Sequence, residues 1–302
     1  MSEKMIKLLL VCVLCNVMPI MSMEYVRGFL QDNDLIFKAI KANNSKAVKQ
    51  VLSGQNDAEK FDIEGQDEHG QTPLFAASME GNLEIVKLLI AANANLEASN
   101  KKDNTPVIAA VWARHEHIVR ELLVNKANVE VTNQHGENSL LIAACRGDVG
   151  IVRVLLDANA NPEARAREGG CRTALSYAAI KGHTAVVREL LERKAYIEAR
   201  DVDGATPLYV AADRGYVDVV QALLVGKADI YSRDKNGDMP LAVAYKQKRE
   251  EVAKVLCVRK SILDGEAASA IGFGVAGAYE PGAPVKASAP EGSGETGEGE
   301  SR

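Results

Sequence analysis

The side chains most able to do chemistry in this chain are its histidines, which number five. They are His69, His115, His117, His135 and His183. No Cys, Asp or Glu stands at a metal-ligand spacing from them, and no nucleophile–base motif appears. His115 and His117 are two residues apart, which on a helix would point them to different faces. The sequence therefore predicts no catalytic residue and no metal site.

The cysteines and one glycine motif are the other candidates for chemistry. An odd, widely spaced set of five cysteines is neither a disulfide framework nor a zinc pattern. Residues 272–277 read G-x-G-x-x-G, but such a motif binds a dinucleotide only where it follows a strand and opens a helix. Here it enters a segment rich in Pro and Gly, so we expect no cofactor.

The elements that would position any functional side chain recur every 33 residues. Copies begin at Thr72, Thr105, Asn138, Thr173, Thr206 and Met239. All copies except the one at Met239 open with a capping residue, often followed by proline, which predicts the start of a helix. A pair of alanines follows, then a turn glycine in four copies, then a second helix with Ile/Val-Val and Leu-Leu pairs on one face.

This order of Thr-Pro-Leu, Ala-Ala, Gly, Ile/Val-Val and Leu-Leu on a 33-residue period resembles the ankyrin repeat over residues 35–262. The resemblance implies an all-α repeat solenoid of stacked helix-turn-helix units with β-hairpin-like fingers. It also implies a concave face formed by the fingers and the first helices. We expect an N-terminal cap at 35–71, repeats at 72–104, 105–137, 138–172, 173–205 and 206–238, and a C-terminal cap at 239–262.

Several positions depart from the family pattern. The glycine that usually ends the second helix is replaced by Asn93, Lys126, Asn159, Lys194 and Lys227. Because that position needs a left-handed backbone, we predict strain at the lysines. Two extra residues lengthen the finger at 164–172. Cys257 stands where other copies have Leu or Ile, so we expect it to be buried and inert. A bond between Cys145 and Cys171 stays possible, because both could lie on the finger side of one repeat.

The two ends differ from the repeats in composition. Residues 1–22 have a basic start, an apolar middle and a small residue near the cut, which predicts a signal peptide followed by a lead at 23–34. We therefore expect a secreted or periplasmic protein, or a cytoplasmic one if this segment is instead a buried or disordered extension. The apolar run is too short to span a membrane. Residues 263–302 are rich in Gly, Ala and Pro and carry the whole formal charge of −5, which predicts a disordered acidic tail.

The residues after each alanine pair face the concave surface in this family. Their first members begin with four apolar side chains, Met79, Trp112, Cys145 and Ile180, before Asp213. Trp112 is the only tryptophan, and tryptophan is enriched among interface anchors. The other reading is that its ring packs on its own finger as structural filler. With their neighbours and the exposed finger residues, the predicted partner-binding set is Met79, Trp112, Cys145, Arg146, Ile180, Lys181, Asp213, Arg214, His69, Lys101, Lys102 and His135.

These features favour a non-enzymatic, monomeric module that binds a protein or a peptide. A neutral body with an acidic tail gives no electrostatic footprint for nucleic acid. Too few residues lie outside the repeats for a catalytic domain or a pore. The alternative is an accessory or structural spacer without a specific partner.

Overall fold

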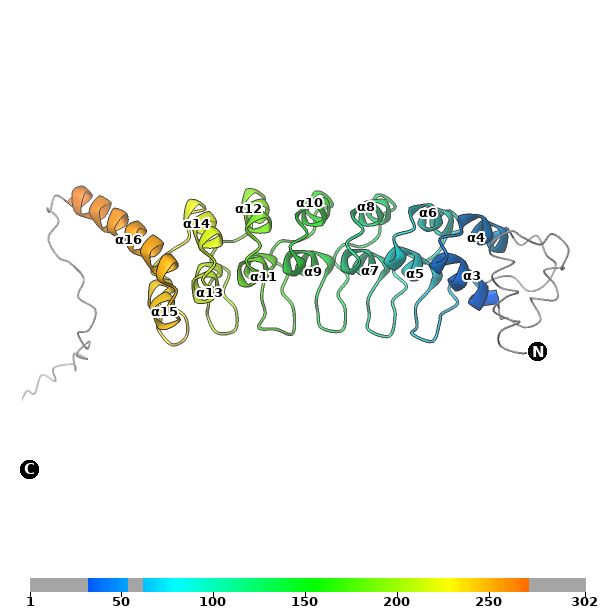
Figure 1. The fold of residues 1–302 in the computed structure, drawn as a ribbon, viewed down its shortest axis with the longest axis horizontal. Helices are drawn as coiled ribbons and strands as arrows, with labels where there is room; N and C mark the ends of the chain where they lie inside the picture. The colour runs from blue at the N-terminus through cyan, green and yellow to red at the C-terminus, as the bar shows by residue number, and fades with distance from the viewer. Residues whose placement is uncertain (1–31, 54–61, 272–302) are drawn as a thin grey trace, which may run out of the picture. The chain divides into compact units, whose positions relative to one another are not determined.

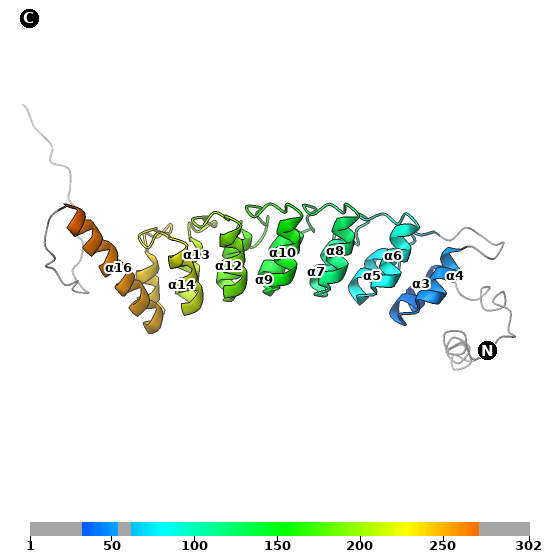
Figure 2. The ribbon, with the colours of Figure 1, turned by 90° about the horizontal axis from the view of Figure 1, so that it is seen from above.

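The computed structural model describes residues 32–53 and 62–271, and every structural statement below concerns these residues. Those up to Val258 belong to one compact unit. In that unit the helices come in antiparallel pairs that stand side by side, with loops projecting from one edge (Figures 1 and 2). The predicted signal peptide and the G-x-G-x-x-G segment lie outside the described residues.

The helices alternate between two rows. The first helices of the pairs are α3 (Asp32–Lys41), α5 (Pro73–Glu80), α7 (Pro106–Trp112), α9 (Ser139–Arg146), α11 (Ala174–Lys181), α13 (Pro207–Arg214) and α15 (Pro240–Lys246). The second helices are α4 (Ser45–Leu52), α6 (Leu83–Ala91), α8 (Glu116–Val124), α10 (Val149–Asp157), α12 (Thr184–Glu192), α14 (Val217–Val225) and α16 (Glu250–Ile271). Each first helix packs beside the first helices of the neighbouring repeats, which is the predicted solenoid.

The predicted caps start the first helices. The hydroxyl of Thr72 accepts a hydrogen bond from the backbone N–H of Phe75 at 3.3 Å, and Asn138 does the same for Leu141 at 3.0 Å. Thr105, Thr173 and Thr206 cap in the same way. These side chains satisfy N–H groups that have no partner inside the helix. Met239 cannot accept such a bond, so α15 begins without a side-chain cap.

The core consists of small and branched side chains. The alanine pairs Ala143-Ala144, Ala178-Ala179 and Ala211-Ala212 are completely buried, and so is the Val-Val pair of α12. Alanine lets the first helices of neighbouring repeats approach closely, while the branched side chains fill the space between first and second helices. This packing accounts for an extensive core in a chain that has few aromatic residues.

The five second helices α6, α8, α10, α12 and α14 are each followed by a residue in the left-handed conformation that the sequence predicts. The φ angles are 64° at Asn93, 69° at Lys126, 61° at Asn159, 63° at Lys194 and 67° at Lys227. Residues with a Cβ adopt this region at a cost of about 1 kcal/mol, more for lysine than for asparagine. The prediction of local strain at these lysines is therefore confirmed in its backbone geometry.

A glutamate joins neighbouring repeats at five successive interfaces. The carboxylate of Glu97 accepts a hydrogen bond from the backbone N–H of Asn128 at 2.7 Å, and Glu130 does the same for Asn161 at 2.6 Å. The same bond recurs from Glu64 to Asn95, from Glu163 to Tyr196 and from Glu198 to Asp229. Because each glutamate reaches only the following repeat, it couples nearest neighbours. We call these five contacts the glutamate staples.

Some boundaries differ from the prediction. Helix α16 continues to Ile271, so the first nine residues of the predicted disordered tail are helical. Helix α3 begins at Asp32, inside the predicted lead. Cys257 is half-buried rather than buried, and its sulfur lies 3.3 Å from the Tyr245 hydroxyl. The thiols of Cys145, Cys171 and Cys257 are unbonded to each other. In the fingers, a lone bridge between Thr132 and Asn138 is the β pairing that the described residues contain.

Candidate functional site

The exposed finger residues are positioned by a repeated turn. The side-chain oxygen of Asn100 accepts the backbone N–H groups of Lys102 and Asn104, at 2.9 and 3.1 Å. Asn133 accepts those of His135 and Glu137 in the same way, both at 3.0 Å. A side chain that bonds its own loop fixes the turn that follows it. Asp67, Asp201 and Asp234 hold the corresponding fingers, so the tip residues are presented in a constant geometry.

Neighbouring fingers are also bonded to each other. The N–H of Gln134 donates to the carbonyl of Lys102 at 3.2 Å, and the N–H of Glu168 donates to that of His135 at 3.2 Å. The Lys101 ammonium reaches back to the carbonyl of Glu68 at 2.7 Å. The fingers therefore form a connected edge.

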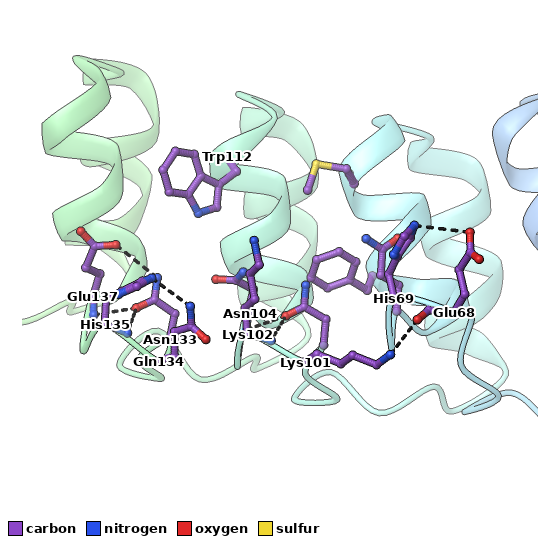
Figure 3. A pocket seen from close by; sticks show the side chains of 14 residues that line it. Glu68, His69, Lys101, Lys102, Asn104, Trp112, Asn133, Gln134, His135 and Glu137 are labelled. Atoms are coloured by element: carbon purple, nitrogen blue, oxygen red, sulfur yellow. Dashed lines mark hydrogen bonds and ion pairs between the residues drawn. The ribbon is translucent and has the colours of Figure 1, made fainter.

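Between the first two regular repeats and their fingers lies an open groove of about 640 Å³. Helices α5 and α7 supply its apolar side, and the fingers supply a polar rim (Figure 3). The lining residues are Glu68, His69, Gln71, Phe75, Met79, Asn100, Lys101, Lys102, Asn104, Trp112, Asn133, Gln134, His135 and Glu137. We call this the Met79–Trp112 groove.

Trp112 is the most exposed large apolar side chain of the groove. Trp112 is 41% exposed as a residue, whereas Phe75 is buried and Met79 is half-buried. The guanidinium of Arg146, from the next first helix, lies 5.2 Å from the ring centroid. Such a cation–π contact attracts the two groups and limits the freedom of the ring. The ring is thus held in place while much of its surface stays in contact with solvent.

The groove collects half of the predicted partner-binding set. Met79, Trp112, His69, Lys101, Lys102 and His135 line it together. The other predicted residues lie further along the stack and do not line it, namely Cys145, Arg146, Ile180, Lys181, Asp213 and Arg214. Among these, Lys181 and Arg214 are exposed, and Cys145 and Ile180 are half-buried. Burial raises the pKa of the Cys145 thiol, which Lys181 opposes.

The sequence did not single out Phe75 as part of the site. This residue stands where the family usually has a histidine, and its ring contributes to the apolar side of the groove. The substitution itself was visible in the sequence. Its role was not, because Phe75 is buried and borders the groove only through the arrangement of the side chains around it.

The histidines outside the groove have structural contacts. The rings of His115 and His117 meet edge to face with centroids 5.8 Å apart, so the expectation that they point to different faces is wrong. The reason is that His115 precedes α8 and lies outside its helical geometry. Its Nε2 lies 3.2 Å from the carbonyl oxygen of Met79, in the preceding repeat. Among the described residues, no three side chains of His, Cys, Asp or Glu are grouped so as to hold a metal ion.

No helix in the described part of the chain is both long and apolar enough to cross a membrane.

The polar rim of the groove contains an ordered histidine. The Nδ1 atom of His135 lies 2.7 Å from the carboxylate of Glu168 on the next finger. The groove therefore combines three apolar side chains, Phe75, Met79 and Trp112, with an ordered polar edge, which is a composition found in binding surfaces.

Comparison with known proteins supports this architecture. A family model described as ankyrin repeats in three copies matches residues 3–100, 36–135, 78–166, 114–201, 140–234 and 197–266. The crystal structure of the ankyrin repeat domain of Bcl-3, a unique member of the IkappaB protein family, is 26% identical over 74% of this chain and 97% of that one, with a TM-score of 0.66. No curated protein matches the chain. Ankyrin repeats are protein-interaction modules, and the family is generally non-enzymatic. On these matches, the chain belongs to the ankyrin repeat family.

Proposed function

We propose that this chain is a non-enzymatic binding protein that holds a protein or peptide partner on its concave surface. One observation carries the proposal: the half-exposed Trp112 ring stands beside Met79 over a groove of about 640 Å³. Residues that dominate binding are typically aromatic side chains in the centre of a contact, surrounded by polar groups that exclude water. The groove has this arrangement.

The rigidity of the site supports the same proposal. The finger turns, the bonds between fingers and the Arg146–Trp112 contact order the groove before any partner arrives. A preorganised surface loses little conformational entropy on association, so more of the contact energy appears as affinity.

The charged rim would orient the partner. Lys102 is exposed at the rim and its ammonium has no hydrogen-bond or ion-pair partner among the described residues. We propose that Arg146, Lys181 and Arg214 extend the contact along the concave surface, with Cys145, Ile180 and Asp213 beside them. Rim charges of this kind mainly set association rate and specificity.

The proposal is tested by purifying partners on the immobilised protein and measuring the affinity of the recovered partner by calorimetry. Trp112→Ala is expected to weaken binding by about 2 kcal/mol, or about thirtyfold in Kd. The matched control is Tyr196→Ala, because Tyr196 is an exposed aromatic residue that does not line the groove. It should bind as the wild type does.

Two results would count against the proposal. Equal affinities for wild type and Trp112→Ala would remove the groove from the contact. Failure to recover any partner from the native source would favour the spacer alternative.

We further propose that the chain is exported, on the basis of the basic and apolar pattern of residues 1–22. The test is to sequence the N-terminus of the mature protein and to determine its cell fraction. A mature chain that begins near Met23 outside the cytoplasm is expected. An intact Met1 on a cytoplasmic protein would refute export and leave the binding proposal unaffected.

A further inference from the structure

Three consecutive fingers carry an arginine at the same place. Arg165, Arg200 and Arg233 each stand immediately before the residue that opens the finger turn, whereas the earlier fingers have Gln66, Ser99 and Thr132 there. None of the three arginines lines the Met79–Trp112 groove. We call them the arginine row.

Each arginine of the row is fixed by backbone carbonyls. Arg165 Nη1 donates to the carbonyl of Cys171 at 2.8 Å and to that of Arg200 at 2.7 Å. Arg200 Nη1 donates to the carbonyls of Gly204 and Arg233, at 3.0 and 2.5 Å. Arg233 Nη1 donates to the carbonyl of Gly237 at 2.7 Å. Arg165 and Arg200 thus bridge to the following finger, and this makes the row continuous.

These contacts leave much of each guanidinium available. The Nε and Nη2 groups of the three arginines have no hydrogen-bond partner among the described residues, and none of the three forms an ion pair there. All three side chains are exposed. A guanidinium has five donors in a planar fork that suits a carboxylate, and here only one nitrogen of each is used.

The carboxylates that directly follow Arg200 and Arg233 in the sequence are engaged elsewhere. Asp201 accepts the N–H groups of Asp203 and Ala205 and also pairs with Arg172 at 3.3 Å. Asp234 accepts the N–H groups of Asn236 and Asp238. The row therefore presents fixed positive charges that the fold itself does not pair. The exposed Asp203, at a finger tip, is the neighbouring acid whose side chain has no partner among the described residues.

The spacing of the row points to the kind of partner. Neighbouring repeats are separated by about 10 Å, the usual distance between packed helices. An extended or polyproline II chain rises about 3.1–3.3 Å per residue, so three residues of it cover that distance. We propose that the arginine row binds an extended acidic peptide segment with a carboxylate at every third position. The row lies outside the groove, so this inference does not depend on the role of Trp112.

The test is fluorescence anisotropy with the full-length protein and two labelled peptides of about twelve residues. One repeats Glu-Pro-Ala, and the other has the same composition with its glutamates contiguous. The periodic peptide is expected to bind at least about fivefold more tightly than the contiguous one, because only it places a carboxylate at each arginine.

Variants distinguish specific binding by the arginine row from a non-specific attraction to positive charge. Arg200→Gln should weaken binding of the periodic peptide by about tenfold, since a paired, fixed charge is lost. The matched control Arg188→Gln removes one exposed charge from α12 and should change the Kd by less than about twofold. Asp203→Asn should strengthen binding. Circular dichroism and the melting temperature of each variant establish that it is folded.

The inference is overturned if the two peptides bind equally, if Arg188→Gln weakens binding as much as Arg200→Gln does, or if neither peptide binds the wild type. Labelled oligothymidine supplies the comparison with a phosphate backbone. Tighter binding of that probe, lost in Arg200→Gln, would assign the row to nucleic acid instead and would also overturn the inference.

Discussion

Arg114 forms an ion pair with Asp148, whose side chain is only 7% exposed. Arg114 has a φ of 65° and occupies the turn where four other repeats have glycine. At Gly81, Gly147 and Gly182 the next repeat packs a ring onto the bare backbone, and a Cβ on Gly81 would lie 2.6 Å from Cε1 of His115. Asp148 stands where His115 stands in the preceding repeat. The ion pair thus replaces a glycine–histidine contact at one interface of the stack.

This relationship predicts a strong coupling between the two positions. Arg114→Gly leaves Arg146, at 3.7 Å, as the one ion-pair partner of the Asp148 carboxylate among the described residues. The variant should destabilise the folded protein by about 1 kcal/mol, although glycine removes the strain of the left-handed backbone at position 114. Asp148→His places a ring against the Cβ of Arg114 and should cost about 1–3 kcal/mol. The double variant recreates the Gly81–His115 contact and should be more stable than either single variant. Urea unfolding gives the free energy of unfolding of the wild type, the two single variants and the double variant. If the two single changes in this free energy add up to that of the double variant, the coupling is refuted.

Replacing Lys194 by glycine should stabilise the protein by about 0.5–1 kcal/mol, because glycine adopts its φ of 63° without steric cost. The side chain is exposed, so little packing is lost. Arg188→Gly, inside α12, is the matched control and should destabilise by about 1 kcal/mol. Thermal and urea unfolding give both values. A lower melting temperature for Lys194→Gly would show that its side chain has a stabilising role that outweighs the strain.

The finger turn at Asp234 should make stability depend on pH. Burial acts to raise the pKa of the Asp234 carboxyl, but hydrogen bonds from the N–H groups of Asp238 and Asn236 and from the Tyr209 hydroxyl outweigh it and lower the pKa. A carboxyl whose pKa is lower in the folded state stabilises above its unfolded pKa of about 3.9, and that contribution is lost as the pH falls through the folded pKa.

Asp234→Asn keeps an acceptor for the turn, as Asn100 and Asn133 do in their fingers, but cannot titrate. The variant should therefore lose less stability than the wild type between pH 5 and about pH 3, measured by urea unfolding. The exposed Glu192 on α12 offers a comparison, and Glu192→Gln should follow the wild-type profile. Parallel curves for wild type and Asp234→Asn would exclude this carboxyl as a source of acid sensitivity.

Cys145 should react slowly with thiol reagents in the native protein. Burial raises the pKa of its thiol, Lys181 lowers it and Glu137 raises it further. Because the thiolate is the reactive form, Ellman's reagent at pH 8 should modify Cys145 more slowly in the native than in the unfolded chain. Lys181→Gln should slow the reaction further by about two- to threefold, while Lys194→Gln should leave it unchanged.

The same titration counts the free thiols. Cys145, Cys171 and Cys257 are unbonded to each other in the structure, so a chain without its first 22 residues should yield three thiols before reduction. A count of one would revive the Cys145–Cys171 bond that the sequence left open.

How far the sequence predicts this structure depends on the range of the interactions. The capping bond of Thr72 and the left-handed backbone at Lys194 follow from local chemistry repeated in register, and both were predicted. The end of α16 was not, because the tail is rich in Gly and Pro as a whole but begins with good helix formers such as Ala267 and Ala268, which extend a helix that is already nucleated. The half-buried position of Cys257 was not predicted either. The described residues after the copy at Met239 do not form a following repeat that would cover it.

The candidate site was predicted in part. The residues that follow the alanine pairs identified Met79 and Trp112 in the sequence. Which of these concave residues share one groove is determined by the positions of the fingers. The cation–π contact of Arg146 and the pairing of Arg114 with Asp148 join residues of different repeats. Such contacts depend on side-chain rotamers across an interface, which a comparison of aligned copies does not provide.

The glutamate staples also determine how the stack comes apart. Each staple joins only adjacent repeats, so the free energy of the array is a sum of unit and interface contributions, as in a one-dimensional chain of coupled elements. The series stops at Tyr231, which occupies the next glutamate position and has no carboxylate. The interface of α15 with α13 is joined by contacts of another kind, among them the hydrogen bond from Arg249 Nε to the carbonyl of Asp213 at 3.0 Å. The staples of Glu64, Glu97 and Glu130 join the repeats that form the Met79–Trp112 groove, so the groove should keep its shape for as long as those interfaces stay intact.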